Sequence, residues 1–370
     1  MHDVAIVGAG PAGAAAALAA ARAGARVVLL DRSDFPRDKA CGDGIAPQAL
    51  AVLRELGVSD VEDGFPPIPA LSITGPSGAH AAAALPEPVR VIPREIFDAR
   101  LVAAALAAGA TLHRHQVRSL RSEPDRVIID GQIEAKVVIG ADGASSVVRR
   151  HLGHEPNPAG HLAIAIRGYA PHPQGRLEQQ IIMSERNWPA YGWSFPIGDG
   201  RRNVGYGQML RGAPVSRAHL LDRLADLLPG VDLAATTGLR AHHLPLSTRR
   251  PPAGRGRVLL AGDALSLINP FTGEGIFYAV VSGALAGAAA AQGGPQAGAV
   301  YRAALRRRLH RHLRHTAAVA RLSSYPQIID AGIRAAGTDR RVFSSFVELG
   351  LGDGLLTLPV LGSVARSLLR

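Results

Sequence analysis

Near residue 260, small and acidic residues have the types and spacing to hold a redox-active ring. An apolar run over 257–261 leads to Asp263, whose carboxylate can accept a hydrogen bond from a ligand hydroxyl. In the segment 269–276 that follows, Gly273 and Gly275 let backbone N–H groups approach a ligand closely. A helix beginning near Gly275 directs its positive end at that ligand. This arrangement suits a flavin, because a helix N-terminus stabilises the negative charge of the reduced ring.

The N-terminus supplies the nucleotide-binding half of such a site. An apolar strand over 2–7 runs directly into Gly8, Gly10 and Gly13 of a G-x-G-x-x-G sequence, and an alanine-rich helix follows. Gly8 permits the tight turn, Gly10 lets the pyrophosphate reach the helix N-terminus, and Gly13 permits close helix–strand packing. A second apolar strand ends at Asp31, which is placed to hold a ribose hydroxyl. The sequence therefore predicts a bound dinucleotide.

Composition limits the class of protein. The chain has 370 residues, enough for two or three domains, and one cysteine, Cys41, which excludes an internal disulfide. No signal peptide precedes the first strand, so we expect a cytoplasmic protein. The net charge is +11, but the basic residues are nearly all arginine and only 4% of residues are aromatic, so we expect no nucleic-acid partner. We also predict no metal site.

The segments between these two regions continue the pattern of a split nucleotide-binding domain. A helix is expected from Arg94 to Gly109, with short strands near Leu112 and over 127–129. A buried strand over 136–139 leads into a Gly-Ala-Asp-Gly turn that contains Asp142. The uncharged stretch 275–301 is rich in alanine and glycine and is broken by Gly-Gly-Pro, so we interpret it as a tightly packed helix and not as a membrane span.

These motifs together resemble the flavin monooxygenase fold shared by aromatic hydroxylases, flavin halogenases and geranylgeranyl reductases. Two segments point to one branch. The segment 35–44 resembles the Pro…Lys-x-Cys-Gly-x-Gly stretch of the geranylgeranyl reductase family, in which the cysteine lies close to the flavin. The segments 191–196 and 204–207 match that family's Tyr-x-Trp-x-Phe-Pro and Val-Gly-x-Gly, whose aromatic residues lie beside the lipid-binding cavity. The resemblance runs from residue 1 to about residue 300.

The resemblance implies a mixed α/β (α+β) fold with FAD as the cofactor. We expect a Rossmann-like FAD-binding domain, an inserted and mostly antiparallel β-sheet substrate domain, and a helical C-terminal region. The FAD-binding domain would comprise 1–63, 94–150 and 255–299, and the substrate domain 64–93 and 151–254. The C-terminal region would be 300–370, and its glycine and leucine content fits an apolar lid over the substrate.

Most candidate site residues follow from the motifs and the resemblance. By resemblance, Cys41, Tyr191 and Trp193 face the substrate and form the candidate catalytic set. Candidate FAD-binding residues come from the loops named above and their neighbours. They are Gly8, Gly10, Ala12, Gly13, Asp31, Arg32, Ala40, Cys41, Gly42, Gly44, Arg94, Val117, Asp142, Asp263, Gly273, Gly275 and Ile276.

Several of these residues also have a structural interpretation. Cys41 is either a proton donor or flavin neighbour, or a small buried apolar residue. Trp193 either faces the substrate or packs in the sheet core. Asp142 either lies in the cofactor region or only closes a strand-end turn. Glu274 is either a proton relay or a helix-start residue that the helix dipole favours.

The expected reaction is reduction of a C=C bond in a prenyl, geranylgeranyl-type or similarly apolar isoprenoid substrate. Hydride comes from reduced flavin, and a proton must reach the other carbon in a dry cavity. The alternative is an FAD-dependent monooxygenase, a hydroxylase or epoxidase, acting on an aromatic or terpenoid natural product. The sequence leaves the electron donor open between NAD(P)H and ferredoxin, the latter an electron-donor protein.

The strongest charge run lies in the segment 302–314, where arginines surround Leu305, Leu309 and Leu313. The leucines are spaced for one stripe of a helix. Two interpretations remain: a basic amphipathic helix that gives peripheral contact with an anionic membrane, or a solvated helix whose leucines pack on the flavin domain.

Overall fold

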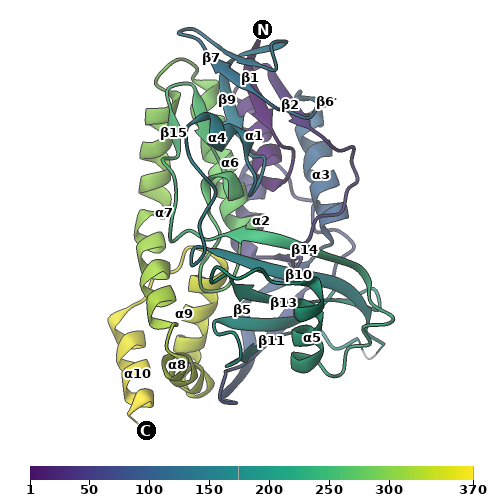
Figure 1. The fold of residues 1–370 in the computed structure, drawn as a ribbon, viewed down its shortest axis with the longest axis vertical. Coiled ribbons are helices and arrows are strands. Elements are labelled where there is room, and N and C mark those ends of the chain that lie inside the picture. Colours follow the sequence, from purple (N-terminus) through teal and green to yellow (C-terminus); the bar gives the residue numbers. More distant parts are fainter. Residues whose placement is uncertain (174, 370) are drawn as a thin grey trace.

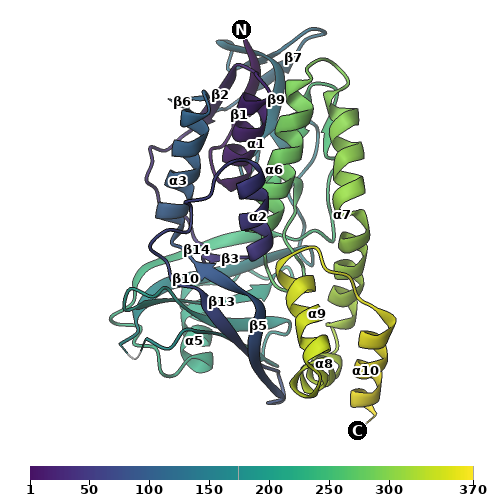
Figure 2. The ribbon, with the colours of Figure 1, turned by 180° about the vertical axis from the view of Figure 1, so that it is seen from behind.

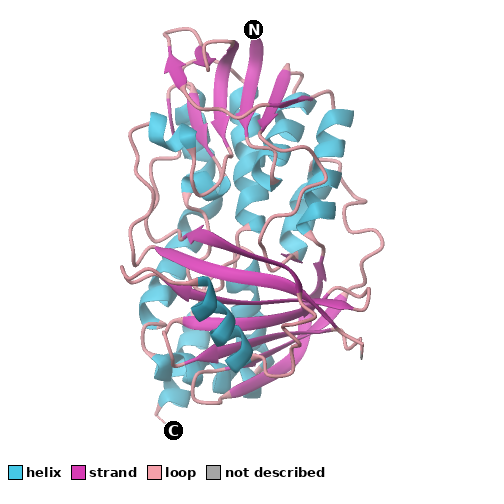
Figure 3. Cartoon of the chain, turned by 45° about the vertical axis from the view of Figure 1, so that its right-hand side comes forward, coloured by secondary structure: helices cyan, strands magenta, loops and turns pink. Residues whose placement is uncertain are grey.

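The computed structural model describes residues 1–173 and 175–369, and over these residues the chain folds around two β-sheets (Figures 1 and 3). The first sheet contains the N-terminal strand, and its central strands are parallel. These strands, in sheet order, are β16 (Val258–Leu260), β9 (Ile133–Gly140), β1 (His2–Val7), β2 (Val27–Asp31) and β6 (Thr111–Arg114). Helices cover both faces of such a sheet, which explains its continuous apolar runs.

Shorter elements extend the first sheet. They are β7 (Leu120–Ser122), β8 (Val127–Ile129) and β15 (Gly254–Arg255), with the short 3₁₀ turn η1 (Gly262–Leu265) after β16. β7, β8 and β9 pair antiparallel in succession, and β15 pairs antiparallel with β16. The carboxyl ends of β1, β2, β9 and β16 therefore meet at one edge of the sheet, where ligands bind in folds of this kind.

Five helices of the described chain lie around the first sheet, and two of them, α1 (Pro11–Arg22) and α6 (Ile276–Ala291), pack against each other at very short range. The other three are α2 (Pro47–Glu55), α3 (Arg94–Ala107) and α4 (Val147–His151). A Cβ atom on Gly283 or Gly287 of α6 would lie 2.1 Å from the carbonyl oxygen of Ala12 or Ala16 of α1. The glycine and alanine content of 275–291 is thus explained by close contact between two helices.

The second sheet is mostly antiparallel. Its strands, in sheet order, are β14 (Thr237–Pro245), β10 (Leu162–Pro171), β13 (Arg201–Met209), β12 (Ala190–Pro196), β11 (Glu178–Ser184), β4 (Ile68–Thr74), β5 (His80–Val91) and β3 (Gly44–Ile45). β11 and β4 pair in parallel, and the other neighbours pair antiparallel. β5 is one continuous strand, and β14 lies at the edge of the sheet.

Helices lie on both faces of the second sheet. α5 (Arg217–Leu227) packs on one face through Leu220 and Leu224. On the other face lie α8 (Pro326–Thr338) and α9 (Arg340–Leu351), with α10 (Leu358–Leu368) beside them, as Figure 2 shows. The C-terminal helices therefore cover a sheet made almost entirely by residues 44–245.

The long helix α7 (Ala297–Leu322) contains the arginine-rich segment 302–314 and runs along both halves of the molecule (Figure 1). Leu309 and Leu313 are buried in the core of the first half, and Leu305 packs against that core. The leucine stripe is therefore unavailable to a membrane, and the arginines remain on the surface with Ala303 and His310. Among the described residues, no helix is long and apolar enough to cross a bilayer.

The mixed α/β fold class is confirmed, with a parallel nucleotide-binding sheet, a largely antiparallel second sheet and a helical C-terminal region. One strand departs from the expected division of the chain: β3 lies within 1–63 but pairs with β5 of the second sheet. We retain the domain limits given above as a proposal.

Candidate active site

A cavity of about 1100 Å³ extends from the nucleotide-binding edge of the first sheet across the second sheet to the C-terminal helices. Gly10 lines it at one end and Ile333 of α8 at the other. Pockets for one drug-sized ligand occupy about 300–1,000 Å³. The cavity therefore has room for more than one small ligand, and its two ends differ in character.

The loop after β1 has the shape that a dinucleotide requires. A Cβ atom on Gly13 would lie 1.8 Å from the carbonyl oxygen of Gly8, and one on Gly8 would lie 2.4 Å from that of Ala141. A Cβ atom on Gly10 would meet only the guanidinium groups of Arg37 and Arg94, at 3.4 and 3.8 Å. Gly10 thus lies open to the cavity, opposite two cations and at the N-terminus of α1, which is the environment that a pyrophosphate needs.

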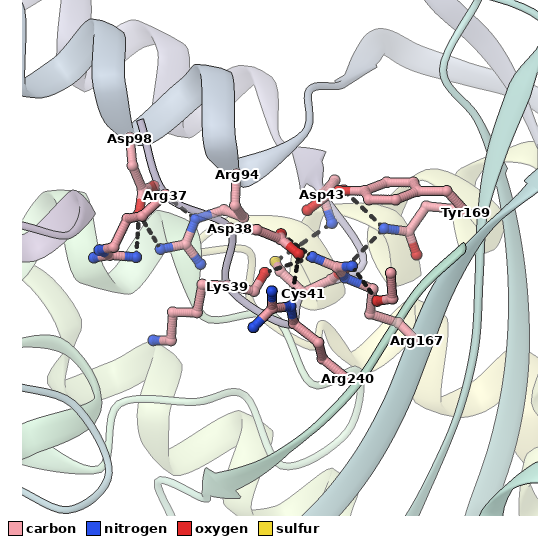
Figure 4. A network of polar contacts seen from close by, with 12 residues as sticks. Arg37, Asp38, Lys39, Cys41, Asp43, Arg94, Asp98, Arg167, Tyr169 and Arg240 are labelled. Atoms are coloured by element: carbon pink, nitrogen blue, oxygen red, sulfur yellow. Dashed lines mark hydrogen bonds and ion pairs between the residues drawn. The ribbon is translucent and has the colours of Figure 1, made fainter. Parts of the chain in front are cut away.

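Those two arginines are held by one buried carboxylate, as Figure 4 shows. Asp98, one turn after Arg94 on α3, accepts hydrogen bonds of 2.6 and 2.7 Å from Nε and Nη2 of Arg94. Nη1 of Arg37 lies 3.3 Å from the same carboxylate. Burial alone lowers the pKa of the Arg94 guanidinium, but Asp98 raises it above its usual value. Arg94 is therefore a fixed cation at the wall of the cavity.

Two other predicted acids bind backbone groups. Asp31 accepts hydrogen bonds from the N–H groups of Ala9 (2.8 Å) and Ser33 (2.9 Å), so it fixes the loop after β1. Asp142 accepts hydrogen bonds from the Ser146 hydroxyl (2.5 Å) and the Val147 N–H (2.7 Å) at the start of α4. Burial raises the pKa of Asp142. Both carboxylates line the cavity and also organise its walls.

Asp263 lies where β16 ends and contacts Lys39, whose Nζ is 3.4 Å from its Oδ2. Burial alone raises the pKa of Asp263, but the charge of Lys39, with His242 and Arg94, lowers it below its usual value. Burial and the same lysine lower the pKa of His242 to about 4, so this histidine is neutral at pH 7. The buried Nε2 of His242 has no partner among the described residues, which fits a polar ligand in the cavity.

Along its whole length, the 269–276 loop, which leads into α6, lines the cavity. Gly275 caps α6, and Glu274 accepts a 2.7 Å hydrogen bond from the N–H of Phe277, so its helix-start role is observed. Burial raises the pKa of Glu274 to about 7. The hydroxyl of Tyr191 donates a 2.5 Å hydrogen bond to the carbonyl of Thr272, which ties β12 to this loop. A carboxyl group that stays partly protonated at neutral pH thus lies beside the loop glycines.

Cys41 lies in the loop between β2 and β3 and lines the same cavity. Its Sγ accepts a 3.3 Å hydrogen bond from the N–H of Asp43, and its carbonyl accepts one of 2.8 Å from the amide of Asn203. Burial raises the pKa of the Cys41 thiol, and the charge of Arg94 offsets this only in part. The cysteine is therefore a thiol at neutral pH, held in place by the second sheet.

The loop 38–43 is attached to the second sheet by a polar network (Figure 4). Arg167 of β10 pairs with Asp38 and donates a 3.0 Å hydrogen bond to the carbonyl of Lys39. The hydroxyl of Tyr169 and the amide of Asn203 donate to Asp43, at 2.7 and 2.8 Å. Burial raises the pKa of Asp43 to about 6. The network joins the two halves of the molecule beside Cys41.

Trp193 packs in the core of the second sheet and also lines the cavity. Its indole N–H donates a 2.8 Å hydrogen bond to Asn203, and its ring packs on Gly205, where a Cβ atom would lie 2.1 Å from it. It is almost fully buried but lines the cavity between Tyr191 and Phe195, whose rings lie 5.9 and 6.4 Å away. Trp193 is therefore part of the sheet core and part of the cavity wall.

The far end of the cavity is apolar. Side chains from the second sheet face side chains from the C-terminal helices across it. They include Leu71, Ile73, Ile181, Val319, Ile329, Ile333, Phe346, Leu356, Val360 and Val364. Part of the C-terminal region thus lines the cavity, as an apolar lid would. Phe346 of α9 and Leu356, which follows α9, are among its lining residues.

The structure brings nearly all the predicted site residues together around this cavity. Every one lines it except Gly13, which packs against Gly8. Sequence reasoning assigned no role to Arg37, Lys39, Asp98, Asn203 or His242. Two signals were available: Asp98 follows Arg94 by four residues on a helix, and Arg37 and Lys39 lie inside the cysteine motif. Nothing local to Asn203 or His242 marks them.

Comparisons with known proteins agree with this geometry. Residues 1–170 match the family model described as an FAD binding domain. The chain is 34% identical over 313 residues to a menaquinone reductase from Mycolicibacterium smegmatis, a match that covers 77% of this chain and 75% of the relative. It is 33% identical over 311 residues to digeranylgeranylglycerophospholipid reductase 1 from Methanopyrus kandleri, covering 77% of this chain and 79% of that one.

Among solved structures, the fold is similar to that of a geranylgeranyl bacteriochlorophyll reductase-like protein from Thermoplasma acidophilum. The TM-score is 0.81 with 21% identity, and the match covers 100% of this chain and 96% of that protein. The sequence relatives, the FAD-binding model and the cavity lead to one assignment. The chain belongs to the geranylgeranyl reductase family and is an FAD-dependent oxidoreductase.

Proposed function

We propose that this enzyme reduces C=C double bonds of a prenyl, geranylgeranyl-type or similarly apolar isoprenoid substrate. The observation that carries the proposal is the continuity of the cavity, which joins a nucleotide-binding end at Gly10 to an apolar end at Ile333. Bound and reduced, FAD supplies the hydride. The names of the relatives, a menaquinone reductase and a digeranylgeranylglycerophospholipid reductase, support a substrate with a prenyl chain.

The polar end has the groups needed to hold FAD. We propose that Gly10 and the N-terminus of α1 bind the pyrophosphate, with Arg94 and Arg37 as its cations. Asp263 would accept a hydrogen bond from a ribityl hydroxyl, in place of part of its contact with Lys39. Other predicted FAD contacts line the same end of the cavity. They are Asp31, Arg32, Ala40 and Val117 on one side and Gly273, Gly275 and Ile276 on the other.

The apolar end suits a long hydrocarbon chain. Its walls are branched aliphatic and aromatic side chains from two elements far apart in sequence, the second sheet and α8 to α10. Burial of such a chain is favourable by about 25 cal/mol per Å² of apolar surface. It also keeps water from the reacting carbons, which matters because an isolated alkene is a poor hydride acceptor.

We propose that side chains of the protein deliver the proton to the alkene. Reduction adds a hydride to one alkene carbon and a proton to the other, so a group that holds a proton at neutral pH is needed at the junction of the two ends. Cys41 is such a group because burial raises the pKa of its thiol, and burial raises the pKa of Glu274 to about 7. We propose Cys41 as the donor and Glu274 as a second proton-holding group, with Tyr191 positioning the 269–276 loop.

An anaerobic assay tests the proposal. Enzyme reduced with dithionite is mixed with a geranylgeranyl lipid or a menaquinone, and the products are analysed by mass spectrometry. We expect a gain of hydrogen with no requirement for oxygen. A product that appears only when oxygen is admitted, and that carries an added oxygen atom, identifies the enzyme as a monooxygenase instead. The same assay with NADH, NADPH or reduced ferredoxin in place of dithionite identifies the electron donor.

A further inference from the structure

The C-terminal helix α10 is apolar on two sides. Its inner side carries Val360, which is buried in the second core, and Val364, which lines the cavity. Its outer side carries Leu358 and Leu368, which are 83% and 47% exposed, and Leu369 follows at 89%. The apolar arc of an amphipathic helix is normally covered by protein or by lipid, and Ser363, Arg366 and Ser367 occupy the rest of the circumference of α10. In the described chain, the outer side of α10 is covered by neither.

The exposed residues form a stripe and not a scatter. At 3.6 residues per turn, Leu358, Leu361, Ala365 and Leu368 fall within about 80° of the helix circumference. Tyr325, between α7 and α8, is 62% exposed. As Figures 1 and 2 show, α10 lies beside the end of α7 at the C-terminal pole of the molecule. We call the stripe, with Leu369, the α10 leucine face.

The cavity opens at this face. Leu361 of α10 and Leu322 at the end of α7 both line the cavity, and they are also 42% and 43% exposed. Side chains that are at once cavity wall and protein surface mark the mouth of the cavity. The apolar end of the proposed substrate site is therefore continuous with an exposed apolar surface.

The surroundings of the face are basic. Arg321 near the end of α7, Arg334 on α8 and Arg366 on α10 are all exposed. Neither α7 nor the segment 354–369 contains an aspartate or a glutamate, and Asp330 of α8 is buried and accepts a hydrogen bond from the backbone N–H of Ser77. A second copy of the chain docked symmetrically here would bring arginines against arginines. An anionic lipid surface complements both the leucines and the arginines.

We propose that the α10 leucine face docks on an anionic phospholipid bilayer and places the mouth of the cavity in the lipid. Docking does not depend on the reaction. Direct entry of a prenyl chain from the bilayer rests on the proposed function. The face differs from the arginine-rich segment 302–314, whose leucines are buried in the core.

Vesicle co-sedimentation of the full-length holoenzyme tests the docking. The probes are phosphatidylcholine vesicles with and without phosphatidylglycerol. We expect binding to the anionic vesicles that weakens as salt is raised. The double variant Leu358→Ser/Leu368→Ser should weaken binding at least about tenfold, because two leucines lose their burial in lipid. Leu106→Ser on α3, which is 41% exposed, is the matched control and should bind like the wild type.

A second variant keeps the test independent of the leucines. Arg321→Glu/Arg366→Glu should lose its preference for anionic vesicles while retaining bound FAD. The proposal is overturned if the wild type binds neither kind of vesicle, or if Leu358→Ser/Leu368→Ser binds as well as the wild type. It is also overturned if that variant converts a dimer in size-exclusion chromatography into a monomer, because the occupant is then a second copy.

The reaction is separated from docking by assaying one prenyl substrate in two forms. With the lipid in anionic vesicles, Leu358→Ser/Leu368→Ser should reduce it more slowly than the wild type; with the lipid in detergent, the two should be equal. Vesicle binding without reduction in either form supports docking and overturns the proposed reaction. Reduction in detergent without vesicle binding overturns docking and leaves the reaction standing.

Discussion

At the scale of single residues, Cys41 places on the cavity wall a thiol whose pKa is raised by burial. Its raised pKa keeps the proton on sulfur at neutral pH. We predict that Cys41→Ser binds FAD as well as the wild type but reduces the prenyl substrate roughly 100-fold more slowly, in the range that a positioned proton donor contributes.

Stopped-flow measurement of the reduced enzyme with substrate checks this prediction, with flavin content measured on the same sample. A control for loop disruption is Asp34→Ser, a change in the same loop at a side chain that is 70% exposed, which should leave the rate nearly unchanged. Turnover of Cys41→Ser at the wild-type rate removes the cysteine from proton delivery and assigns it to packing.

Glu274 is the residue whose protonation changes nearest to neutral pH. Burial raises its pKa from 4.5 to about 7, so the carboxyl group is mostly protonated below pH 7 and ionised above it. If the protonated form takes part in proton delivery, the rate of reduction falls as pH rises through about 7. We predict that Glu274→Gln, which keeps an acceptor for the N–H of Phe277, loses this limb of the pH profile.

The free energy of unfolding should also depend on pH through the protonation of Glu274. Because the folded pKa of Glu274 is above the unfolded one, its contribution is fully present below about pH 4.5 and is lost as pH rises towards 7. The free energy of unfolding of wild type minus that of Glu274→Gln should therefore decrease over this interval. A flat difference between pH 4.5 and 7.5 shows that the glutamate is not held protonated in the fold.

Asp98 gives a prediction for cofactor binding. Its buried carboxylate accepts both hydrogen bonds from Arg94 and faces Arg37. Asp98→Asn leaves Arg94 without its anion and Arg37 with only the more distant Asp31, 3.9 Å away, so the geometry of both guanidinium groups at Gly10 is lost. We expect FAD affinity to fall at least tenfold by fluorescence titration, with Glu95→Gln on the exposed side of α3 as a neutral control. Unchanged affinity removes this pair from the pyrophosphate site.

At the scale of elements, the contact between α1 and α6 fixes the relative position of the two loops that we propose bind FAD. A Cβ atom at Gly287 would lie 2.1 Å from the carbonyl oxygen of Ala16, and backbone cannot yield as a flexible side chain does. We predict that Gly287→Val lowers the free energy of unfolding by about 3 kcal/mol, the upper part of the range for overpacking. Ala288→Val, exposed on the same helix, controls for the helix propensity of valine.

Thermal unfolding of the two apoproteins provides the comparison. A loss for Gly287→Val no greater than for Ala288→Val contradicts close packing as the reason for glycine there. The two loops that this contact positions, after β1 and before α6, are both near the cavity, so Gly287→Val should also weaken FAD binding.

The elements also show which features a sequence can reveal. The loop at Gly8 directly follows the buried strand β1, and the loop at Gly275 directly precedes α6, so local sequence predicts both. β14 is an edge strand, mostly exposed and carrying arginine and histidine, and has no apolar alternation to detect. Neighbours such as Asn203 and Cys41 lie 162 residues apart and meet only because β13 packs against the loop after β2.

The C-terminal helices illustrate the same limit. Their apolar content indicated a lid, but the surface that they cover is decided by contacts between α8 and the distant strands β4 and β5. The interpretation of 302–314 was open for the same reason: its leucine stripe fits lipid or protein equally, and only the core of the first half decides between them.

At the scale of the whole molecule, the cavity joins the flavin half, the second sheet and the C-terminal helices, so its length limits the substrate. Ile333 of α8 lies at the far end, 5% exposed and in contact with the second core. We predict that Ile333→Trp shortens the apolar end without touching the flavin loops. A geranylgeranyl substrate should then show a KM raised roughly tenfold or more, because part of the chain loses its burial.

A shorter geranyl substrate is the internal control for that variant, because it does not reach Ile333 if the reacting double bond lies near Cys41. Its kcat and KM should stay near the wild-type values, and FAD content should be unchanged. Equal losses for both chain lengths indicate general disruption of the fold. No loss for either means that the prenyl chain leaves the cavity before α8, and the region lined by Ile329, Ile333 and Val360 then needs another occupant.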